Sequence, residues 1–236
     1  MLDYQSHDTK SPAERGDTRY LSHHDLAQRV TLSPLTMIMK RGLDIMGSLC
    51  LLIITAPLFG FISLLVALDG GPILFSHDRI GRNGKQFGCL KFRTMILGAE
   101  PCLAEYLDHH PDAKAEWQRD QKLGFDPRIT PIGRMLRATS LDELPQLINI
   151  LRGDMSLVGP RPVTHPELER YGDAQSHYLS VRPGLTGPWQ ISGRNDVGYS
   201  ERVALDHAYV TGLSLMRDLA ILIQTPAAVL SRRGAR

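Results

Sequence analysis

The sequence predicts a mostly helical α+β domain that rests on one N-terminal membrane segment. Three observations support this prediction. The chain has 236 residues, 42% of them apolar and 22% charged, which fits one globular domain. An uncharged run, Ile45–Leu68, interrupts this composition near the N-terminus. Segments with strand character are short, and neither a GxGxxG motif nor a Walker loop is present, so a doubly wound sheet is not expected.

Charge and composition exclude several classes of protein. A formal net charge of +2 is too small for a dedicated nucleic-acid binder, which concentrates many more Lys and Arg residues on one face. Cys50, Cys89 and Cys102 form no CxxC pair, and no cleavable signal is recognised, so we expect a reducing compartment. The histidines lack HExxH spacing, which argues against a zinc site built from neighbouring ligands.

Residues 1–36 are polar and show no sustained apolar period. Pro12, Gly16 and Pro34 interrupt them, and such residues favour turns over regular structure. We therefore expect a flexible tail with a short helix around His23–Val30, and we assign no chemistry to it.

Residues 37–68 contain the membrane segment. A helix of about 24 residues, at ~1.5 Å per residue, covers about 36 Å, enough for a hydrocarbon core of about 30 Å. Pro57 lies near its middle and removes one backbone hydrogen bond, and Gly60 weakens the same region. The sequence therefore predicts a helix that is kinked or broken at Pro57.

Basic residues flank this segment on both sides, which bears on whether it crosses the bilayer. Lys40 and Arg41 precede it, and a run of basic residues follows it: Arg79, Arg82, Lys85, Lys91 and Arg93. Basic flanks favour the cytoplasmic side, so a re-entrant helix that breaks at Pro57 and returns is the preferred interpretation. A kinked transmembrane span remains the alternative. Asp44 is expected to pair with Arg41 or Lys40 or to be solvated at headgroup level.

The remaining residues, 69–236, predict one domain with a short hairpin followed by helices. The expected elements are a turn at Gly70–Pro72, strands at Ile73–Phe75 and Phe87–Met95 around a turn at Gly81–Gly84, and helices at Leu97–Leu123 (divided by Pro101 and Pro111), Ser140–Leu151, Glu167–Leu179 and Glu201–Thr211. Leu213–Leu230 is apolar and precedes the basic tail Ser231–Arg236, a pattern that suits an amphipathic helix on an anionic membrane surface.

Two adjacent carboxylates, Asp142 and Glu143, give the strongest indication of chemistry. Ser140 with Glu143 matches a helix capping box, and Asp142 itself could be the cap, so a structural role is one interpretation. In the other, Asp142 is a nucleophile that attacks phosphorus, while the adjacent carboxylate holds a divalent cation. The positive end of the helix dipole would favour the incoming phosphoryl oxygens.

Several cationic side chains lie beside Gly or Pro. The backbone at such positions fixes the direction in which an arginine guanidinium points. Arginine grips phosphate with two hydrogen bonds, so recognition of a pyrophosphate is a natural hypothesis, although any single arginine is more often structural. The candidates beside Gly or Pro are Arg128, Arg134, Arg161 between Pro160 and Pro162, Arg182 and Arg194; Lys91, Arg93 and Arg137 are further candidates in short loops.

Together these motifs resemble the bacterial sugar transferases, in their small monotopic form that acts as polyprenyl-phosphate hexose-1-phosphate transferases. The similarity covers about five sixths of the chain, all except the N-terminal tail. It is carried by Lys40–Asp44, the Pro57-broken segment, Arg79–Gly84, Lys91–Met95, Arg128–Gly133, Ser140–Leu147, Asp154–Pro162, Arg182–Gly187, Gly193–Asn195, Leu205–Asp206 and Tyr209–Val210.

The resemblance implies an enzyme at the cytoplasmic face of the bacterial inner membrane. Such enzymes move a hexose 1-phosphate, here galactose or glucose, from a UDP-hexose to undecaprenyl phosphate, release UMP and initiate exopolysaccharide synthesis. It also implies a monotopic fold whose re-entrant helix, residues 37–68, anchors a catalytic domain at 69–236. Membrane lipids are the expected surroundings, and no nucleic acid is expected as a partner.

The resemblance assigns roles to individual residues. Asp142 is implied to be the nucleophile that forms a phosphoryl-aspartate, and Glu143, with Asp142, is implied to hold Mg²⁺. Lys91 and Arg93 match positions near the phosphates. Pro160 and Arg161 match a loop associated with the nucleotide, and Arg194 and Asp206 match further polar positions of the site.

Three alternatives remain at this point. A non-catalytic membrane scaffold would be expected to lack the acidic pair or the arginine loops, and both are present. A glycosyltransferase that moves the sugar without its phosphate would release UDP instead of UMP. A transmembrane adaptor would expose its N-terminus outside the cell.

Overall fold

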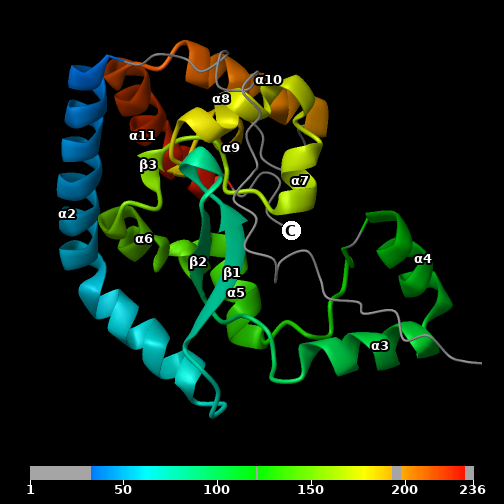
Figure 1. Cartoon of the computed structure of the whole chain (residues 1–236). Coiled ribbons are helices and arrows are strands. Elements are labelled where there is room, and N and C mark those ends of the chain that lie inside the picture. Colours follow the sequence, from blue (N-terminus) through cyan, green and yellow to red (C-terminus); the bar gives the residue numbers. More distant parts are fainter. Residues whose placement is uncertain (1–32, 121, 193–197, 232–236) are drawn as a thin grey trace, which may run out of the picture.

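The protein is described here by a computed structural model covering residues 33–120, 122–192 and 198–231 (Figure 1). The elements in chain order are α2 (Pro34–Ala67), β1 (Leu74–Ile80), η2 (Arg82–Gly84), β2 (Gln86–Phe92), α3 (Ala99–His109), α4 (Pro111–Asp120), α5 (Pro131–Thr139), η3 (Leu141–Glu143), α6 (Gln146–Arg152), β3 (Ser156–Val158), α7 (His165–Glu169), η4 (Gly172–Ala174), α8 (Gln175–Ser180), β4 (Gly184–Thr186), α9 (Pro188–Ile191), α10 (Tyr199–Thr211) and α11 (Leu215–Leu230).

Helices dominate, and the strands form two small sheets. β1 and β2 pair antiparallel, with Leu74 opposite Phe92 and Ile80 opposite Gln86. β3 and β4 pair in parallel. The predicted mostly helical α+β class is confirmed, and the sheets within the described residues are not doubly wound.

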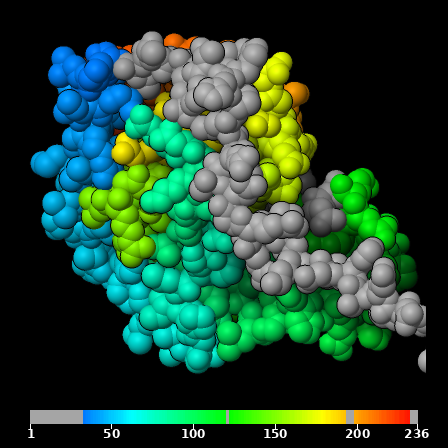
Figure 2. All heavy atoms as spheres, viewed as in Figure 1, coloured from blue at the N-terminus to red at the C-terminus, as the bar shows by residue number. Residues whose placement is uncertain are grey.

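Helix α2 forms one edge of the molecule in both views, where its blue and cyan residues run from top to bottom (Figures 1 and 2). In its first half, up to Ser48, the burial pattern is the reverse of that of a soluble amphipathic helix, which buries apolar residues and exposes polar ones. Lys40, Asp44 and Ser48 are buried against the domain. The apolar side chains facing outward are Leu35, Ile38, Met39, Ile45, Met46, Leu49, Leu51, Ile53, Ile54, Leu58, Phe61 and Leu64.

This apolar outer face agrees with the predicted membrane segment. Among the described helices, α2 is the one long and apolar enough to cross a membrane. It is continuous from Pro34, three residues earlier than predicted, and it contains Pro57. Figure 1 shows it bending between its blue and cyan parts, as the proline predicts. The Thr55 hydroxyl donates a 2.7 Å hydrogen bond to the Leu51 carbonyl, a contact that also favours bending.

The predicted hairpin is confirmed, although its strands lie at Leu74–Ile80 and Gln86–Phe92. The predicted helix Leu97–Leu123 was expected to be divided at Pro101 and at Pro111, and the division at Pro111 is confirmed. Pro111 begins α4, but Pro101 lies in the first turn of α3, where a missing N–H costs no intrahelical hydrogen bond.

The second half of the predicted helix Ser140–Leu151 is confirmed as α6, but its first half is the 3₁₀ turn η3, which Pro145 separates from α6. The predicted capping box at Ser140 is wrong. Ser140 has a left-handed backbone with φ of 57°, and its side chain makes no capping hydrogen bond. Helix α5 before it was not predicted. The long helix Glu167–Leu179 is divided into α7, η4 and α8, with Gly172 at φ of 51°.

The two predicted C-terminal helices are confirmed as α10 and α11. Helix α11 buries Asp218 and Ile221 and exposes one apolar face, formed by Met216, Leu219, Ile223 and Leu230. The predicted helix at His23–Val30, residues 1–32 of the predicted tail and most of the basic C-terminal tail lie outside the described residues.

Candidate active site

The structure brings Lys91, Asp142 and Glu143 together from two separate segments. The Lys91 Nζ lies 2.7 Å from a Glu143 carboxylate oxygen and 3.6 Å from a carboxylate oxygen of Asp142. Lys91 is the penultimate residue of β2, and both carboxylates belong to η3. These three side chains form one ion cluster, which we call the Lys-Asp-Glu cluster.

The left-handed backbone of Ser140 explains how the chain presents these carboxylates. The Ser140 N–H ends α5 by donating to the Leu136 and Arg137 carbonyls, and its own carbonyl accepts from the Glu143 N–H. This tight reversal directs η3 back toward β2. Leu136 and Leu141, on either side of Ser140, pack with Phe92 of β2 and so hold this reversal in place.

Asp142 is the buried member of the cluster, whereas the side chains of Lys91 and Glu143 are 27% and 31% exposed. Asp142 is 7% exposed. Burial raises the pKa of Asp142, Lys91 and Arg137 oppose that rise, and Glu143 adds to it. Burial alone would lower the pKa of Lys91, but Glu143 and Asp142 raise it above its ordinary value. Lys91 is therefore held as a cation beside the two carboxylates.

Arg137 and Arg161 lie near this cluster. The Arg137 Nε donates a 2.9 Å hydrogen bond to the Thr94 hydroxyl, two residues after β2 ends, and its charge lowers the pKa of Asp142. Arg161 is exposed, and its guanidinium lies 5.4 Å from the centre of the Trp189 ring. Its charge lowers the pKa of Lys91. Both arginines can therefore act on an anion bound at the cluster.

Pro160 shapes the loop that carries Arg161. It is buried, and its carbonyl accepts a 2.7 Å hydrogen bond from the Gly184 N–H. The backbones of Gly159 and Gly184 approach so closely that a Cβ on either residue would collide with the other strand. These glycines therefore permit the contact that positions the loop.

Three predicted arginines are instead occupied with their own chain. Arg93 bonds Asp69 and the carbonyls of Val66, Pro72 and Met95, so it fastens the end of α2 to β2. Arg128 forms two side-chain hydrogen bonds with Asp126. The Arg182 Nε donates to the Gly153 carbonyl. None of these contacts involves Asp142 or Glu143, and Arg194 lies outside the described residues.

Asp206 occupies a separate buried pocket of tyrosines. Its side chain accepts a 2.9 Å hydrogen bond from the Tyr171 hydroxyl, and its other oxygen has no hydrogen-bond partner among the described residues. Burial raises the pKa of Asp206 to about 7, while the bond from Tyr171 opposes this rise. Tyr171 packs with Tyr178 and Leu179, away from the apolar cluster that supports η3.

The donor set fits a magnesium ion better than a zinc ion. Among the described residues no group of three or more His, Cys, Asp and Glu side chains could hold a metal. The cluster offers two adjacent carboxylates, and Mg²⁺ is commonly bound by one or two carboxylates together with water and substrate phosphates. Asp142 and Glu143 are therefore chemically suited to a Mg²⁺ that arrives with its phosphate ligand.

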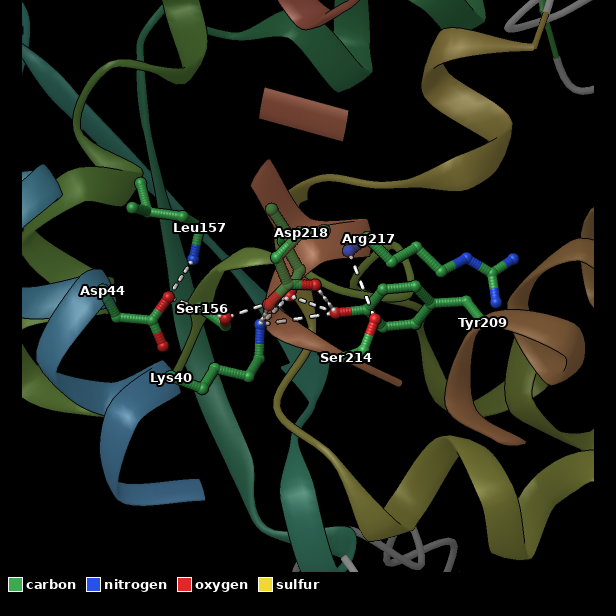
Figure 3. Close-up of polar contacts among 9 residues, drawn as sticks. Lys40, Asp44, Ser156, Leu157, Tyr209, Ser214, Arg217 and Asp218 are labelled. Carbon is green, nitrogen blue, oxygen red and sulfur yellow. Dashed lines mark hydrogen bonds and ion pairs between the residues drawn. The ribbon is translucent and has the colours of Figure 1, made fainter. Parts of the chain in front are cut away.

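A second polar cluster, which sequence reasoning missed, joins α2 to the C-terminal helix (Figure 3). The Lys40 Nζ lies 2.6 Å from the Asp218 carboxylate and 2.9 Å from the Val158 carbonyl. The Tyr209 hydroxyl donates a 2.7 Å hydrogen bond to Asp218. The spacing of Lys40, Asp44 and Ser48, four residues apart, could have indicated a buried polar face.

Asp44 was expected to pair with Lys40 or Arg41 or to be solvated, and both expectations are wrong. It is buried and accepts hydrogen bonds from the Leu157 N–H and the Ser156 hydroxyl, at 2.8 and 2.9 Å. Arg41 instead donates to the Ile150 and Leu151 carbonyls at the end of α6. The basic motif that precedes the apolar run therefore binds the domain itself.

Comparison with known proteins identifies one family, described as "Bacterial sugar transferase", which matches residues 35–232. The undecaprenyl-phosphate galactose phosphotransferase of Salmonella typhimurium is 53% identical over 197 residues, which is 84% of this chain and 41% of that protein. The exopolysaccharide production protein ExoY of Rhizobium meliloti is 51% identical over 86% of this chain and 90% of its own length.

A more distant relative is the undecaprenyl-phosphate glucose phosphotransferase of Komagataeibacter xylinus. It is 39% identical over 84% of this chain and 37% of its own length. The chain thus spans about two fifths of the relatives named as phosphotransferases, and nearly the full length of ExoY.

Proposed function

The chain belongs to the bacterial sugar transferase family, and we propose that it transfers a hexose 1-phosphate from a UDP-sugar to undecaprenyl phosphate. UMP is the second product, and the reaction initiates exopolysaccharide synthesis. The names of the Salmonella and Komagataeibacter relatives support the lipid acceptor and a galactosyl or glucosyl donor. The name of ExoY, which this chain nearly matches in length, supports the exopolysaccharide product.

The observation that carries the proposal is the Lys-Asp-Glu cluster. Asp142 is buried with a lysine 3.6 Å away: burial raises the pKa of its carboxyl above the ordinary value, and the Lys91 charge opposes part of this rise. Such a carboxylate suits nucleophilic attack on phosphorus. Arg137 and Arg161 supply further positive charge nearby, which would stabilise the phosphoryl oxygens as their charge develops.

The proposed reaction has two displacements at one phosphorus. An Asp142 oxygen attacks the phosphorus that bears the sugar, the bond from that phosphorus to the UMP oxygen breaks, and a sugar-phosphoryl aspartate forms. An oxygen of undecaprenyl phosphate then attacks the same phosphorus. The acyl-phosphate bond breaks, Asp142 returns as a carboxylate, and the lipid carries the sugar on a pyrophosphate.

We propose that Glu143, together with Asp142, holds Mg²⁺ during this reaction. When bound, the ion would neutralise negative charge on the pyrophosphate of the donor. Lys91 now forms the 2.7 Å ion pair with Glu143, so binding of the ion would compete with this pair. The expected role of Lys91 is then to contact the phosphate oxygens.

A monotopic arrangement at the cytoplasmic face of the inner membrane is supported by contacts at both ends of α2. Lys40 and Asp44 bond the domain near its start. Ile62 and Val66 pack with Phe92 near its end. Both ends of this helix contact the same domain, as would the ends of a helix that dips into the bilayer and returns. This geometry favours the re-entrant interpretation over a span, and the exposed apolar face of α11 would lie on the same membrane.

The identity of the nucleotide product tests this proposal. Purified protein in nanodiscs is incubated with undecaprenyl phosphate, Mg²⁺ and UDP-galactose or UDP-glucose, and nucleotides are separated by chromatography. We expect UMP that depends on the lipid. Release of UDP would instead identify a glycosyltransferase, and release of no nucleotide from any of several UDP-sugars would indicate a scaffold.

A further inference from the structure

The side chain of Asn149, from α6, bonds the backbone of β2 at two points. Its Oδ1 accepts a hydrogen bond from the Leu90 N–H, and its Nδ2 donates one to the Gly88 carbonyl, both at 2.9 Å. Asn149 is 1% exposed. The side-chain amide therefore takes the place that a backbone peptide of a third strand would take beside β2.

The same residue also organises the end of α6. Its backbone carbonyl accepts from the N–H groups of Gly153 and Asp154, at 3.1 and 3.0 Å. Arg41 from α2 bonds the next two carbonyls of α6, those of Ile150 and Leu151. Asn149 thus lies where the membrane helix, α6 and β2 are joined.

Lys91 follows directly after Leu90, whose N–H Asn149 holds. Its Nζ reaches back to Asp142 and Glu143, which precede α6 by only a few residues. A shift of β2 along α6 would therefore move Lys91 relative to both carboxylates. We infer that Asn149 is a positioning residue that fixes the register of β2 against α6, so that Lys91 reaches the two carboxylates.

The inference deepens the proposed function and rests on it for its catalytic consequence, although the placement of Lys91 can be measured without any activity. The two bonds need one donor and one acceptor in one planar group. Asn149→Asp has nearly the same shape and keeps an acceptor for Leu90. Once ionised at an alkaline labelling pH, its carboxylate cannot donate to Gly88 and also repels the Asp154 carboxylate, which lies 3.4 Å from the Asn149 Nδ2. Asn149→Ala removes both bonds. Ser180→Ala is the matched control, because Ser180 is also buried and its hydroxyl donates to the nearby His177 carbonyl.

Amine labelling tests the position of Lys91 directly. Each full-length variant in nanodiscs is treated briefly with acetic anhydride, and acetylation of individual lysines is quantified by mass spectrometry. We expect Lys91 to react several-fold faster in both Asn149 variants, because its ion pair with Glu143 is weakened. Lys85, which is exposed in the turn before β2, should be unchanged and reports on the fold of the hairpin.

Equal Lys91 labelling in the wild type and Asn149→Asp would overturn the inference, whether or not the protein releases UMP. A rise at Lys85 as large as that at Lys91 would also overturn it, since it would indicate general unfolding. Because Asn149→Ala could unfold, the Asp variant decides the result.

A double-mutant cycle tests the catalytic consequence. We expect Asn149→Asp to lower kcat for UMP release by about 100-fold, as a displacement of about 1 Å can, with a smaller change in KM. In the Lys91→Met background the same substitution should cost almost nothing further. Equal fold-losses in both backgrounds would show that Asn149 does not act through Lys91. Ser180→Ala should leave kcat unchanged.

Discussion

Lys40 and Asp218 form a buried ion pair of 2.6 Å between the first and the last described helix of the chain (Figure 3). Their side chains are 8% and 0% exposed. The pair binds α2 to α11, and the exposed apolar residues of both helices lie on the surface of the resulting unit. Helix α2 is therefore an integrated part of the domain.

The first prediction concerns this ion pair. Lys40→Met leaves the Asp218 carboxylate buried without its cation, and it should lower the free energy of unfolding by about 3–5 kcal/mol. Thermal or denaturant unfolding in detergent measures the loss. Adding Asp218→Asn to Lys40→Met should restore part of it, because the isolated charge is then removed.

Lys114→Met is the matched control for this prediction. Lys114 pairs with Asp108 at 3.6 Å, but both side chains are more than half exposed. Exposed pairs contribute about 0–1 kcal/mol, so this variant should unfold like the wild type. Equal effects of Lys40→Met and Lys114→Met would contradict the structural importance of the buried pair.

The second prediction concerns the cation of the active site. Lys91→Met removes the positive charge beside Asp142 and Glu143, and kcat for UMP release should fall by about 10²–10³-fold, the range seen when one stabilising donor is lost. Steady-state kinetics with UDP-galactose measures this loss. Lys85→Met, in the exposed turn before β2, should retain wild-type kcat. A Lys91 variant with normal kcat would remove this residue from the proposed mechanism.

The third prediction concerns membrane topology. Ser33 lies directly before α2, whose start is bonded to the domain through Lys40. In a variant without native cysteines, Ser33→Cys and Lys85→Cys should both resist a membrane-impermeant maleimide in intact cells. Both should react once the inner membrane is permeabilised. Labelling of Ser33→Cys alone in intact cells would instead establish a transmembrane span.

The fourth prediction concerns pH and stability. Burial raises the pKa of Asp206 to about 7, so the folded protein binds a proton that the unfolded chain releases at its ordinary value of 3.8. The contribution of Asp206 to the free energy of unfolding is therefore fully present below the ordinary pKa of 3.8. It falls by about 1.4 kcal/mol per pH unit as the pH rises from there to about 7.

Asp206→Asn should abolish this dependence. Unfolding temperatures from pH 5 to pH 8 should fall more steeply in the wild type than in the variant, apart from a constant offset between them. Other titrating groups are shared by both proteins, so the difference isolates Asp206. Parallel curves would show that Asp206 is ionised throughout this range.

Sequence reasoning identified the acidic pair and Lys91 because their residue types suit phosphate chemistry, and the structure brings all three together. It could not identify the geometry that presents them. The motif around Ser140 predicts a helix cap, but the proline at 145 and the left-handed backbone of Ser140 produce a 3₁₀ turn instead. Local propensity does not determine such a reversal, which depends on packing against Phe92.

The arginines show more clearly that residue type and sequence neighbours do not predict which side chains reach the site. Pro and Gly neighbours accompany Arg161, which lies near Lys91, and also Arg182, which bonds a backbone carbonyl of its own chain. The same local context thus serves two purposes, and only the tertiary fold distinguishes them. Asn149 has no distinctive neighbours, and its role depends on a strand about sixty residues earlier in the chain.

In the proposed mechanism Asp142 carries the sugar phosphate during transfer. To test this, the protein is mixed with UDP-galactose or UDP-glucose and Mg²⁺ without lipid acceptor and quenched in acid, and the masses of the intact protein and of its peptides are measured. We expect an adduct of one hexose phosphate on Asp142 that undecaprenyl phosphate removes and that Asp142→Asn lacks. An adduct on another residue, or lipid-dependent UMP release undiminished in Asp142→Asn, would contradict it.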